Sequence, residues 1–303
     1  MAKLHHGIIV SMFLVAASHQ VFAAPTFQGD WESGTVIGNG SSNWLSLQSV
    51  APDRITLIND GVRAGTYARV EVRPGDNPLA CCYDTDRAEV SGMQDTNGAQ
   101  IFENLGSGTQ RYSFSVKFDA GWQNIVDHGY GAWGIFLQLH GADGMPPALS
   151  FSATDQIRFN MLAGDLTKPT TIGTSSPLGT LNSGQWIDFI LTAKFAADDT
   201  GFVNILRRDE GQASFQEVLN LTNTPTLQFD SSVNAGAVSD HYWKTGLYRN
   251  RQDFTSVLYL DGMTREAVAA VPEPGEYALM LSGLAVVGIV TRRRRDKSSL
   301  LRI

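Results

Sequence analysis

Three short segments of the chain carry most of the side chains that could perform chemistry. They are 87–90 (Arg-Ala-Glu-Val), 138–140 (Gln-Leu-His) and 242–250 (Tyr-Trp-Lys-Thr-Gly-Leu-Tyr-Arg-Asn). Each is typical of a β-strand, on which every second side chain points to the same face. The residues predicted to share a face within their strand are Arg87 with Glu89, Gln138 with His140, and Tyr242 with Lys244 and Tyr248.

These residue types suit the removal of a proton from a carbon that lies beside a carboxylate. Arginine and glutamine donate hydrogen bonds to a carboxylate and stabilise negative charge that develops on it. Histidine and tyrosine can accept and donate the protons. This chemistry requires no metal ion and no organic cofactor, and the adjacent cysteines Cys81 and Cys82 lack the spacing of a metal site.

The N-terminal segment has the pattern of a secretory signal peptide. Residues 1–23 contain Lys3, an apolar run and the small residue Ala23 at the end. A positive start, an apolar centre and a small residue before the cut are what a signal peptidase recognises. We therefore expect cleavage after position 23 and an exported protein.

The C-terminal segment, 271–303, resembles a different sorting signal. It contains Pro-Glu-Pro at 272–274, an uncharged stretch at 277–291 and four arginines at 292–295. The uncharged stretch is shorter than the roughly 20 residues of a spanning helix, and the arginines are expected to stay in the cytoplasm. This order closely resembles the PEP-CTERM signal of certain bacteria, which an exosortase-type enzyme processes.

That resemblance implies a transient inner-membrane anchor. After removal of the tail, the mature protein would be periplasmic, at the cell surface or extracellular. An ordinary single-span anchor is the alternative reading of the same residues.

The residues between the two ends, 24–270, are predicted to form one all-β domain. Alternating apolar and polar residues over short runs indicate half-buried strands, and clusters of Gly, Asn, Asp and Pro separate them. Besides the segments named first, the predicted strands are 67–73, 112–118, 134–140, 149–151, 157–162, 186–195, 201–207 and 256–261. So many strands in one domain favour a two-sheet β-sandwich of the jelly-roll, concanavalin A-like kind.

The alternation also predicts which side chains face the core. In 134–140, the inward side chains would be Ile135, Leu137 and Leu139, and the concave face would carry Phe136, Gln138 and His140. In 67–73, the side chains predicted to point outward are Arg69, Glu71 and Arg73. The expectation is therefore a polar groove on one sheet face.

The domain is acidic, but its basic residues are clustered. Leaving out the two ends removes seven of the 23 basic and three of the 30 acidic residues, so 24–270 has a net charge of −11. Binding of nucleic acid is not expected, because it needs broad positive charge. Seven basic residues nevertheless fall in 63–87 and 244–251, which predicts a basic groove for an anionic chain: Arg63, Arg69, Arg73, Arg87, Lys244, Arg249 and Arg251.

The three segments together resemble a known family. The patterns Arg-Ser/Thr-Glu-Leu/Val, Gln-Ile/Val-His and Tyr-Phe-Lys-Ala-Gly-x-Tyr-x-Gln, in this order, mark the jelly-roll alginate lyases. The sequence is similar to that group and to its relatives, the glucuronan lyases and heparin lyase I-like proteins. It departs from the alginate lyase pattern at Ala88, Trp243, Thr245 and Asn250, which favours the relatives over alginate lyase itself.

The resemblance implies a polysaccharide lyase that cleaves an acidic, uronate-containing polysaccharide of the alginate or glucuronan type by β-elimination. Arg87 and Gln138 would bind the C6 carboxylate, His140 would be the general base and Tyr248 the general acid. If proton and leaving group lie on the same face of the sugar, Tyr248 could serve in both roles. Lys244 would bind substrate, and the other predicted substrate contacts are Arg69, Arg73, Glu89, Tyr242 and Asn250. A structural calcium ion, as in some relatives, is compatible with the sequence.

Two other functions compete with this interpretation. A retaining glycosidase needs two carboxylates about 5 Å apart, and the nearest approximation is the set Asp84, Asp86 and Glu89. A noncatalytic carbohydrate-binding sandwich is the second alternative. Such a protein has no need for a proton-transfer pair, so His140 and Tyr248 favour the lyase.

Overall fold

The computed structural model describes residues 26–38, 43–79, 84–129, 131–142, 144–168, 172–232 and 236–268. The predicted signal peptide, the predicted sorting tail and Cys81 with Cys82 lie outside these residues, so what we expect of them stays a prediction. Within the described part of the chain, no helix is long and apolar enough to cross a membrane.

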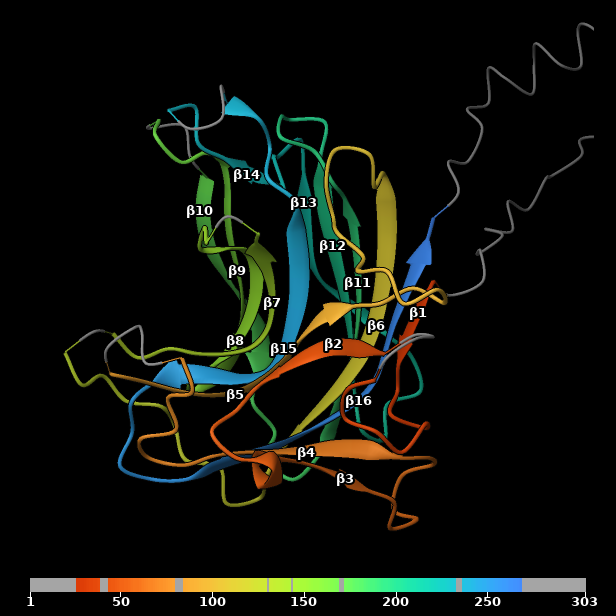
Figure 1. The fold of residues 1–303 in the computed structure, drawn as a ribbon, viewed down its shortest axis with the longest axis vertical. Coiled ribbons are helices and arrows are strands. Elements are labelled where there is room, and N and C mark those ends of the chain that lie inside the picture. The colour runs from red at the N-terminus through yellow and green to blue at the C-terminus, as the bar shows by residue number, and fades with distance from the viewer. Residues whose placement is uncertain are drawn as a thin grey trace, which may run out of the picture. The chain divides into compact units, whose positions relative to one another are not determined.

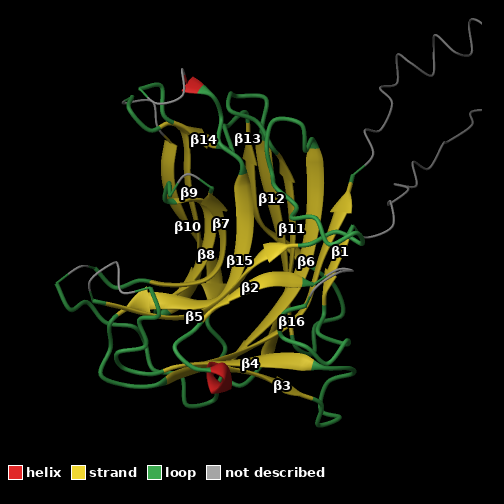
Figure 2. Ribbon diagram, viewed as in Figure 1, coloured by secondary structure: helices red, strands yellow, loops and turns green. Residues whose placement is uncertain are grey.

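Two β-sheets pack against each other to form a sandwich (Figures 1 and 2). We call one the β6 sheet; its strands in order are β13 (Gln216–Thr222), β12 (Phe202–Asp209), β11 (Trp186–Lys194), β6 (Thr109–Phe118), β16 (Ser256–Ala267), β4 (Tyr67–Val72) and β3 (Ile55–Ile58), with β1 (Phe27–Gly29) also pairing with β16. Neighbouring strands in this order are antiparallel.

The second sheet, which we call the β7 sheet, carries the residues of interest. Its strands in order are β10 (Ile172–Thr180), β9 (Gln156–Asp165), β8 (Pro147–Ala153), β7 (Gly134–Gly141), β15 (His241–Asn250), β5 (Thr85–Met93) and β2 (Trp44–Gln48). The short strand β14 (Gln228–Phe229) pairs with β9 in parallel, and one 3-10 turn, η1, spans Pro52–Arg54. The predicted jelly-roll sandwich is confirmed.

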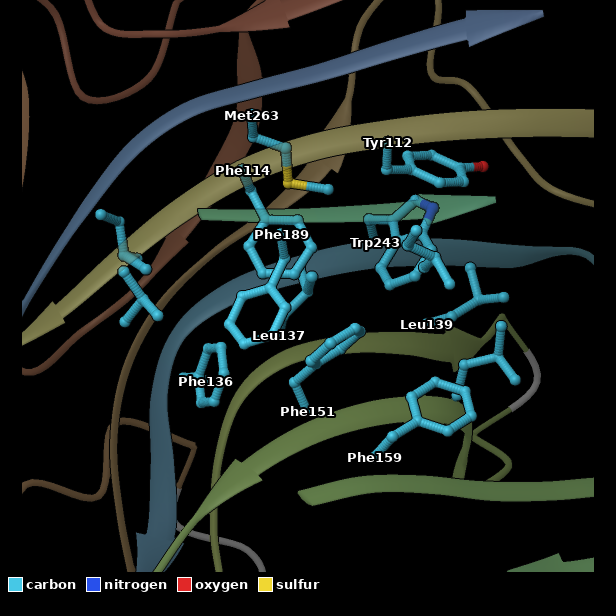
Figure 3. Packing of buried hydrophobic residues seen from close by; sticks show 14 of the residues in the cluster. Tyr112, Phe114, Phe136, Leu137, Leu139, Phe151, Phe159, Phe189, Trp243 and Met263 are labelled. Carbon is cyan, nitrogen blue, oxygen red and sulfur yellow. The ribbon is translucent and has the colours of Figure 1, made fainter. Parts of the chain in front are cut away.

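Aromatic side chains from both sheets meet in the core (Figure 3). Phe114 of β6 stacks on Phe189 of β11, with ring centroids 5.4 Å apart. Phe151 of β8 meets both rings edge-on from the opposite sheet, at 5.1 and 5.5 Å. Offset and edge-to-face arrangements are the favourable ones for aromatic rings, so these contacts hold the two sheets at a fixed spacing.

The predicted faces hold along most of the chain, but β7 differs at one point. Phe136 is buried in the core and contacts Phe118 and Phe151, whereas Ile135 is only half-buried. The pairing of β7 with β8 shifts between Ile135 and Leu137. This β-bulge inserts one residue and reverses the alternation locally, so the expected positions of Ile135 and Phe136 were wrong, while Leu137 and Leu139 lie in the core as predicted.

Candidate active site

The three segments that drew attention in the sequence form adjacent strands at the centre of the β7 sheet. β15 pairs with β5 on one side and with β7 on the other. The cross-strand pairs are Tyr248 with Arg87, Lys244 with Gln138, and Tyr242 with His140. Directly opposed residues share a face. These six side chains therefore occupy one face, which we call the polar face because it is turned away from the core.

Gly246 makes this register possible. It lies between Lys244 and Tyr248, has a φ of +144°, and faces the β5 backbone so closely that a Cβ would be 2.2 Å from the carbonyl oxygen of Ala88. Only glycine fits such a contact and such a φ. The pairing of β15 with β7 also shifts here, between Thr245 and Tyr248. The irregularity lies on the β7 side of β15, whereas the pairing with β5, which sets Tyr248 opposite Arg87 on the same face as Lys244, is regular.

Glu89 is the centre of a buried charged cluster on the polar face. Its carboxylate lies 3.1 Å from Lys244 Nζ and 3.6 Å from Arg87 Nη1, and it accepts a hydrogen bond from Gln138 Nε2. All four side chains are buried, and Glu89 is 1 % exposed. These three donors engage the carboxylate of Glu89, which orients them. The predicted contact of Glu89 with substrate stays a prediction.

The ring of Tyr248 is fixed between a cation and an aromatic side chain. The guanidinium carbon of Arg87 lies 3.8 Å from the ring centroid, and Trp133 meets the ring edge-on at 4.8 Å. Arg87 Nη1 also donates a hydrogen bond to Gln48 Oε1 on β2, at 3.2 Å. The sequence did not indicate Gln48, because β2 has only a weak alternation. Trp133 precedes β7. Its contact with the ring of Tyr248 arises only in the folded protein, so local sequence patterns do not predict it.

His140 is held in a form that can accept a proton. Its Nδ1 lies 2.8 Å from the carbonyl oxygen of Gly141, to which it can donate a hydrogen bond. We assign the Nδ1–H tautomer on this contact, which leaves Nε2 with a free lone pair. Burial lowers the pKa of His140, and the nearby Lys244 lowers it further. Neutral imidazole is therefore the resting form near neutral pH.

Tyr242 lies beside His140, with ring centroids 5.6 Å apart. Burial raises the pKa of Tyr242, and the charge of Glu89 raises it further. This hydroxyl stays protonated, so Tyr242 can donate a hydrogen bond to a sugar but is unsuited to act as a base. Its predicted contact with substrate stays a prediction.

Asn250 ends β15, two residues beyond Tyr248, and its predicted contact with substrate stays a prediction. Its side chain is buried; Nδ2 donates to the carbonyl oxygen of Val126 at 3.0 Å, and Oδ1 accepts from the backbone N–H of Trp133 at 3.4 Å. Both bonds tie the segment before β7 to the end of β15. Asn250 also contributes to one wall of a cavity of about 430 Å³ beyond the end of the strand. Its bonds indicate that it positions Trp133 and, through it, Tyr248.

The predicted basic groove does not form. Arg69 lies on β4 in the β6 sheet and pairs with Glu71 at 2.6 Å, and Arg73, just after β4, pairs with the same carboxylate. Arg63 pairs with Asp261 of β16, again in the β6 sheet. The expectation that Arg69 and Arg73 bind substrate beside Arg87 was therefore wrong, because their strand belongs to the other sheet.

Two further cations of the predicted groove lie away from the cluster around Glu89. Arg249 is fully buried and forms an ion pair with Asp86 at 3.3 Å. Arg251 is exposed at the strand end, 3.9 Å from Asp84. Of the seven clustered basic residues, only Arg87 and Lys244 reach the cluster around Glu89.

No group of three or more His, Cys, Asp or Glu residues that could hold a metal ion occurs in the part of the chain that the structure describes. The acidic residues near the site serve other purposes. Asp86 points to the core, where it pairs with Arg249, whereas Glu89 points to the polar face. They do not form the facing carboxylate pair that a retaining glycosidase needs.

These features define a class of protein. A jelly-roll sandwich whose polar sheet face carries a neutral histidine, an oriented tyrosine and a cationic cluster is suited to act on an anionic carbohydrate. A family model described as polysaccharide lyase matches residues 31–264. The chain belongs to this polysaccharide lyase family.

A solved structure with a TM-score above 0.5 supports the fold. The endo-β-1,4-glucuronan lyase from the fungus Trichoderma reesei is similar, with a TM-score of 0.57 and 15% identity over 80% of this chain and 95% of that chain. The alginate lyase from Aplysia kurodai has a TM-score of 0.47 and 10% identity over 80% of this chain and 99% of that chain. No curated protein sequence matches the chain.

Proposed function

We propose that this polysaccharide lyase cleaves a 4-linked, uronate-containing polysaccharide, of the alginate or glucuronan type, by β-elimination. The observation that carries the proposal is the order of cross-strand pairs on the polar face. His140 with Tyr242 comes first, Gln138 with Lys244 next, and Tyr248 with Arg87 last. His140 can accept a proton and the hydroxyl of Tyr248 can donate one. Along β15, the pair of Lys244 with Gln138 lies between them.

The cluster around Glu89 supplies the electrostatics. Arg87 and Lys244 bring two positive charges and Glu89 one negative charge, so the cluster carries a net positive charge where the C6 carboxylate would lie. When the C5 proton leaves, negative charge spreads onto that carboxylate. Donors that are already oriented stabilise this charge without reorganising.

In the proposed mechanism, His140 and Tyr248 transfer the protons. Nε2 of His140 takes the C5 proton, and the electron pair of the C5–H bond forms the C4–C5 double bond. The C4–O4 bond breaks, and the hydroxyl of Tyr248 protonates the departing O4. The products are a chain with a new hydroxyl and a chain that ends in an unsaturated uronate. Where proton and leaving group lie on the same face of the sugar, Tyr248 serves as both base and acid.

The two alternatives have less support. Hydrolysis would need a second carboxylate facing Glu89, and among the described residues Asp84 and Asp86 do not supply it: Asp86 pairs with buried Arg249, and Asp84 precedes the strand. A carbohydrate-binding protein without activity would not need the neutral, oriented His140 beside the charged cluster around Glu89.

A panel of polysaccharides tests the proposal. The purified protein is incubated with polyglucuronate, polymannuronate, polyguluronate and a carboxyl-reduced form of each. We expect the ultraviolet absorbance of the conjugated product to rise with at least one polyuronate and with none of the reduced polymers. Chain shortening without that absorbance would replace elimination by hydrolysis, and binding without shortening would favour the noncatalytic alternative.

We also propose that the mature enzyme acts outside the inner membrane, after signal peptidase removes 1–23 and an exosortase-type enzyme removes the tail. An acidic polysaccharide is then its partner in that compartment. The support is the sequence of the two ends, which lie outside the described residues.

A further inference from the structure

The half of the β7 sheet that the proposed mechanism does not use is also polar. Cross-strand pairing continues from Gln138 to Ser150 of β8, from Ser150 to Asn160 of β9, and from Asn160 to Ser175 of β10. Ser175 Oγ donates to Asn160 Oδ1 at 2.7 Å, and Asn160 Nδ2 donates to Ser152 Oγ at 2.8 Å. The bonds show that these side chains lie on the same face as the proposed catalytic residues.

Arg158 of β9 places a positive charge on this half of the β7 sheet. It is half-exposed on β9, between the core residues Ile157 and Phe159. Its Nε donates to Ser175 Oγ and its Nη2 to the carbonyl oxygen of Ser175, both at 2.8 Å. The guanidinium is therefore held in one orientation by neutral acceptors, with Nη1 outside these bonds.

Unlike Arg87 and Lys244, Arg158 has no carboxylate as a close partner. It takes part in none of the ion pairs among the described residues. Asp155 is close enough to sense its charge, but the carboxylate of Asp155 bonds to Thr154 Oγ1. In an acidic domain, an oriented guanidinium without an ion-pair partner is available to an external anion.

The register connects Arg158 to the cleavage point. Arg158 pairs with Ser152, Ser152 with Ile135, and Ile135 with Tyr248. Three strand spacings separate Arg158 from Tyr248, and each is about 4.8 Å, which makes about 14 Å along the sheet. Because β8 and β7 lie between Arg158 on β9 and Tyr248 on β15, a polymer chain that crosses the strands would meet the two residues with different sugars.

We propose that Arg158 binds the carboxylate of a uronate that lies several sugars away from the bond being cleaved. The fork of guanidinium donors matches a carboxylate, and the bonds to Ser175 reduce the freedom lost on binding. Hydroxyl and amide groups of Ser150, Ser152 and Asn160 would contact the sugars between the two points. This inference rests on the proposed function, because it names a distal subsite for the same polymer.

The test compares substrates of increasing length. The wild-type protein, Arg158→Gln and Arg158→Lys are assayed on 4-linked oligouronates of defined length, from the polyuronate cleaved fastest. Arg208→Gln is the control, because it removes the same charge from the outer face of the β6 sheet, where Arg208 pairs with Asp188. In parallel, calorimetry measures binding of polyglucuronate and alginate, each with its carboxyl-reduced form.

We expect kcat/KM of the wild type to rise with oligomer length. Arg158→Gln should lose about tenfold on the long oligomers, a typical value for one charge-assisted hydrogen bond, and nothing on the shortest cleaved one. Arg158→Lys should keep part of the rise in kcat/KM with oligomer length. Arg208→Gln should keep all of this rise. An equal loss at every length, or no loss at any length, would overturn the subsite.

The two arms separate this inference from the proposed function. If the wild type cleaves polyuronates but Arg158→Gln changes neither length dependence nor binding, the subsite is wrong and the lyase function stands. If no polymer is cleaved but Arg158→Gln weakens binding only of the carboxylated forms, elimination is wrong and the subsite stands. If the wild type neither cleaves nor binds any polyuronate, both are wrong.

Discussion

The protonation state of His140 decides whether it can act as a base. Burial lowers the pKa and favours the neutral form, in which the Nδ1 contact with the Gly141 carbonyl leaves Nε2 as the acceptor. Lys244 also lowers the pKa, whereas the hydrogen bond to Gly141 and the charge of Glu89 raise it. The local charges thus shift the pKa of His140. Removing one of them should therefore shift the pH dependence of the enzyme.

The first prediction concerns this pH dependence. Because the neutral form of His140 is active and its pKa is lowered, kcat/KM should rise with pH through a midpoint below the ordinary value of 6.5. Initial rates on the best polyuronate over a pH series give the midpoint. A midpoint above the ordinary value, or an unchanged acidic limb in His140→Gln, would remove His140 from the role of base.

The second prediction concerns Tyr248. Tyr248→Phe keeps the ring between Arg87 and Trp133 but removes the hydroxyl assigned to the leaving oxygen. Turnover should fall by at least about 10²-fold, as for loss of a general acid, with little change in substrate affinity. Kinetics together with calorimetry on the variant would measure both.

Tyr242→Phe is the matched control for Tyr248→Phe, since it removes a hydroxyl from the same face of the same strand. Its loss should be smaller, because the proposed mechanism gives Tyr242 no proton to transfer. Near wild-type turnover for Tyr248→Phe would contradict the mechanism even if the fold and the cationic cluster are right.

At the scale of strands, one sequence pattern occurs twice with different outcomes. Arg69-Val70-Glu71 on β4 and Arg87-Ala88-Glu89 on β5 both place an arginine and a glutamate on one face. The first pair lies on the outer face of the β6 sheet and the second beside Tyr248. Alternation predicts a face but not the sheet to which a strand belongs, which is why Arg69 and Arg73 were misplaced.

The third prediction uses this repetition. Arg87→Gln should lower kcat/KM by about 10²-fold, because the guanidinium orients Tyr248 and stabilises charge on the substrate. Arg69→Gln, an identical change next to an identical partner, should leave kcat/KM unchanged, since exposed pairs contribute little. A comparable activity loss in both variants would mean that the substrate also reaches the β6 sheet.

The fourth prediction concerns Glu89, which joins three strands through Arg87, Lys244 and Gln138. Glu89→Gln leaves two buried cations without their carboxylate, so the free energy of unfolding should fall by about 3 kcal/mol. Adding Lys244→Met should restore part of it, because the uncompensated charge is removed. Denaturant titrations of Glu89→Gln, Lys244→Met and the double variant, with the wild type as reference, measure the coupling.

The substitution Glu89→Gln should also change the pH dependence of kcat/KM. Glu89 raises the pKa of His140, so the midpoint of the acidic limb should move to lower pH in Glu89→Gln. Full stability and an unmoved midpoint would show that the carboxylate has no positioning role.

At the scale of the whole molecule, the sequence predicted the all-β sandwich and ten of its strands, because those strands alternate apolar and polar residues. It missed β10, whose run Ile172–Thr180 is rich in Gly, Ser and Pro, and it missed the short strands β1, β2, β3, β13 and β14. β10 is an edge strand, where such residues are tolerated. Phe136 was misassigned because a bulge is not visible in a simple alternation.

The site was predicted in part for a similar reason. Motifs gave the residues of the three central strands, and their adjacency in the sheet follows from the jelly roll. Long-range contacts could not be foreseen from local patterns: Glu89 with Lys244, Asn250 with Val126, and Gln48 with Arg87. Each joins segments far apart in the chain.

Elimination breaks the polymer without consuming water, whereas hydrolysis consumes one water molecule for each bond. The most direct measurement is mass spectrometry of the oligosaccharides that the purified protein releases in water labelled with heavy oxygen. For each cleavage, elimination predicts one unsaturated end and one end with a new hydroxyl, and no labelled oxygen at the cleaved bond. Saturated products that incorporate one labelled oxygen for each cleavage would contradict elimination.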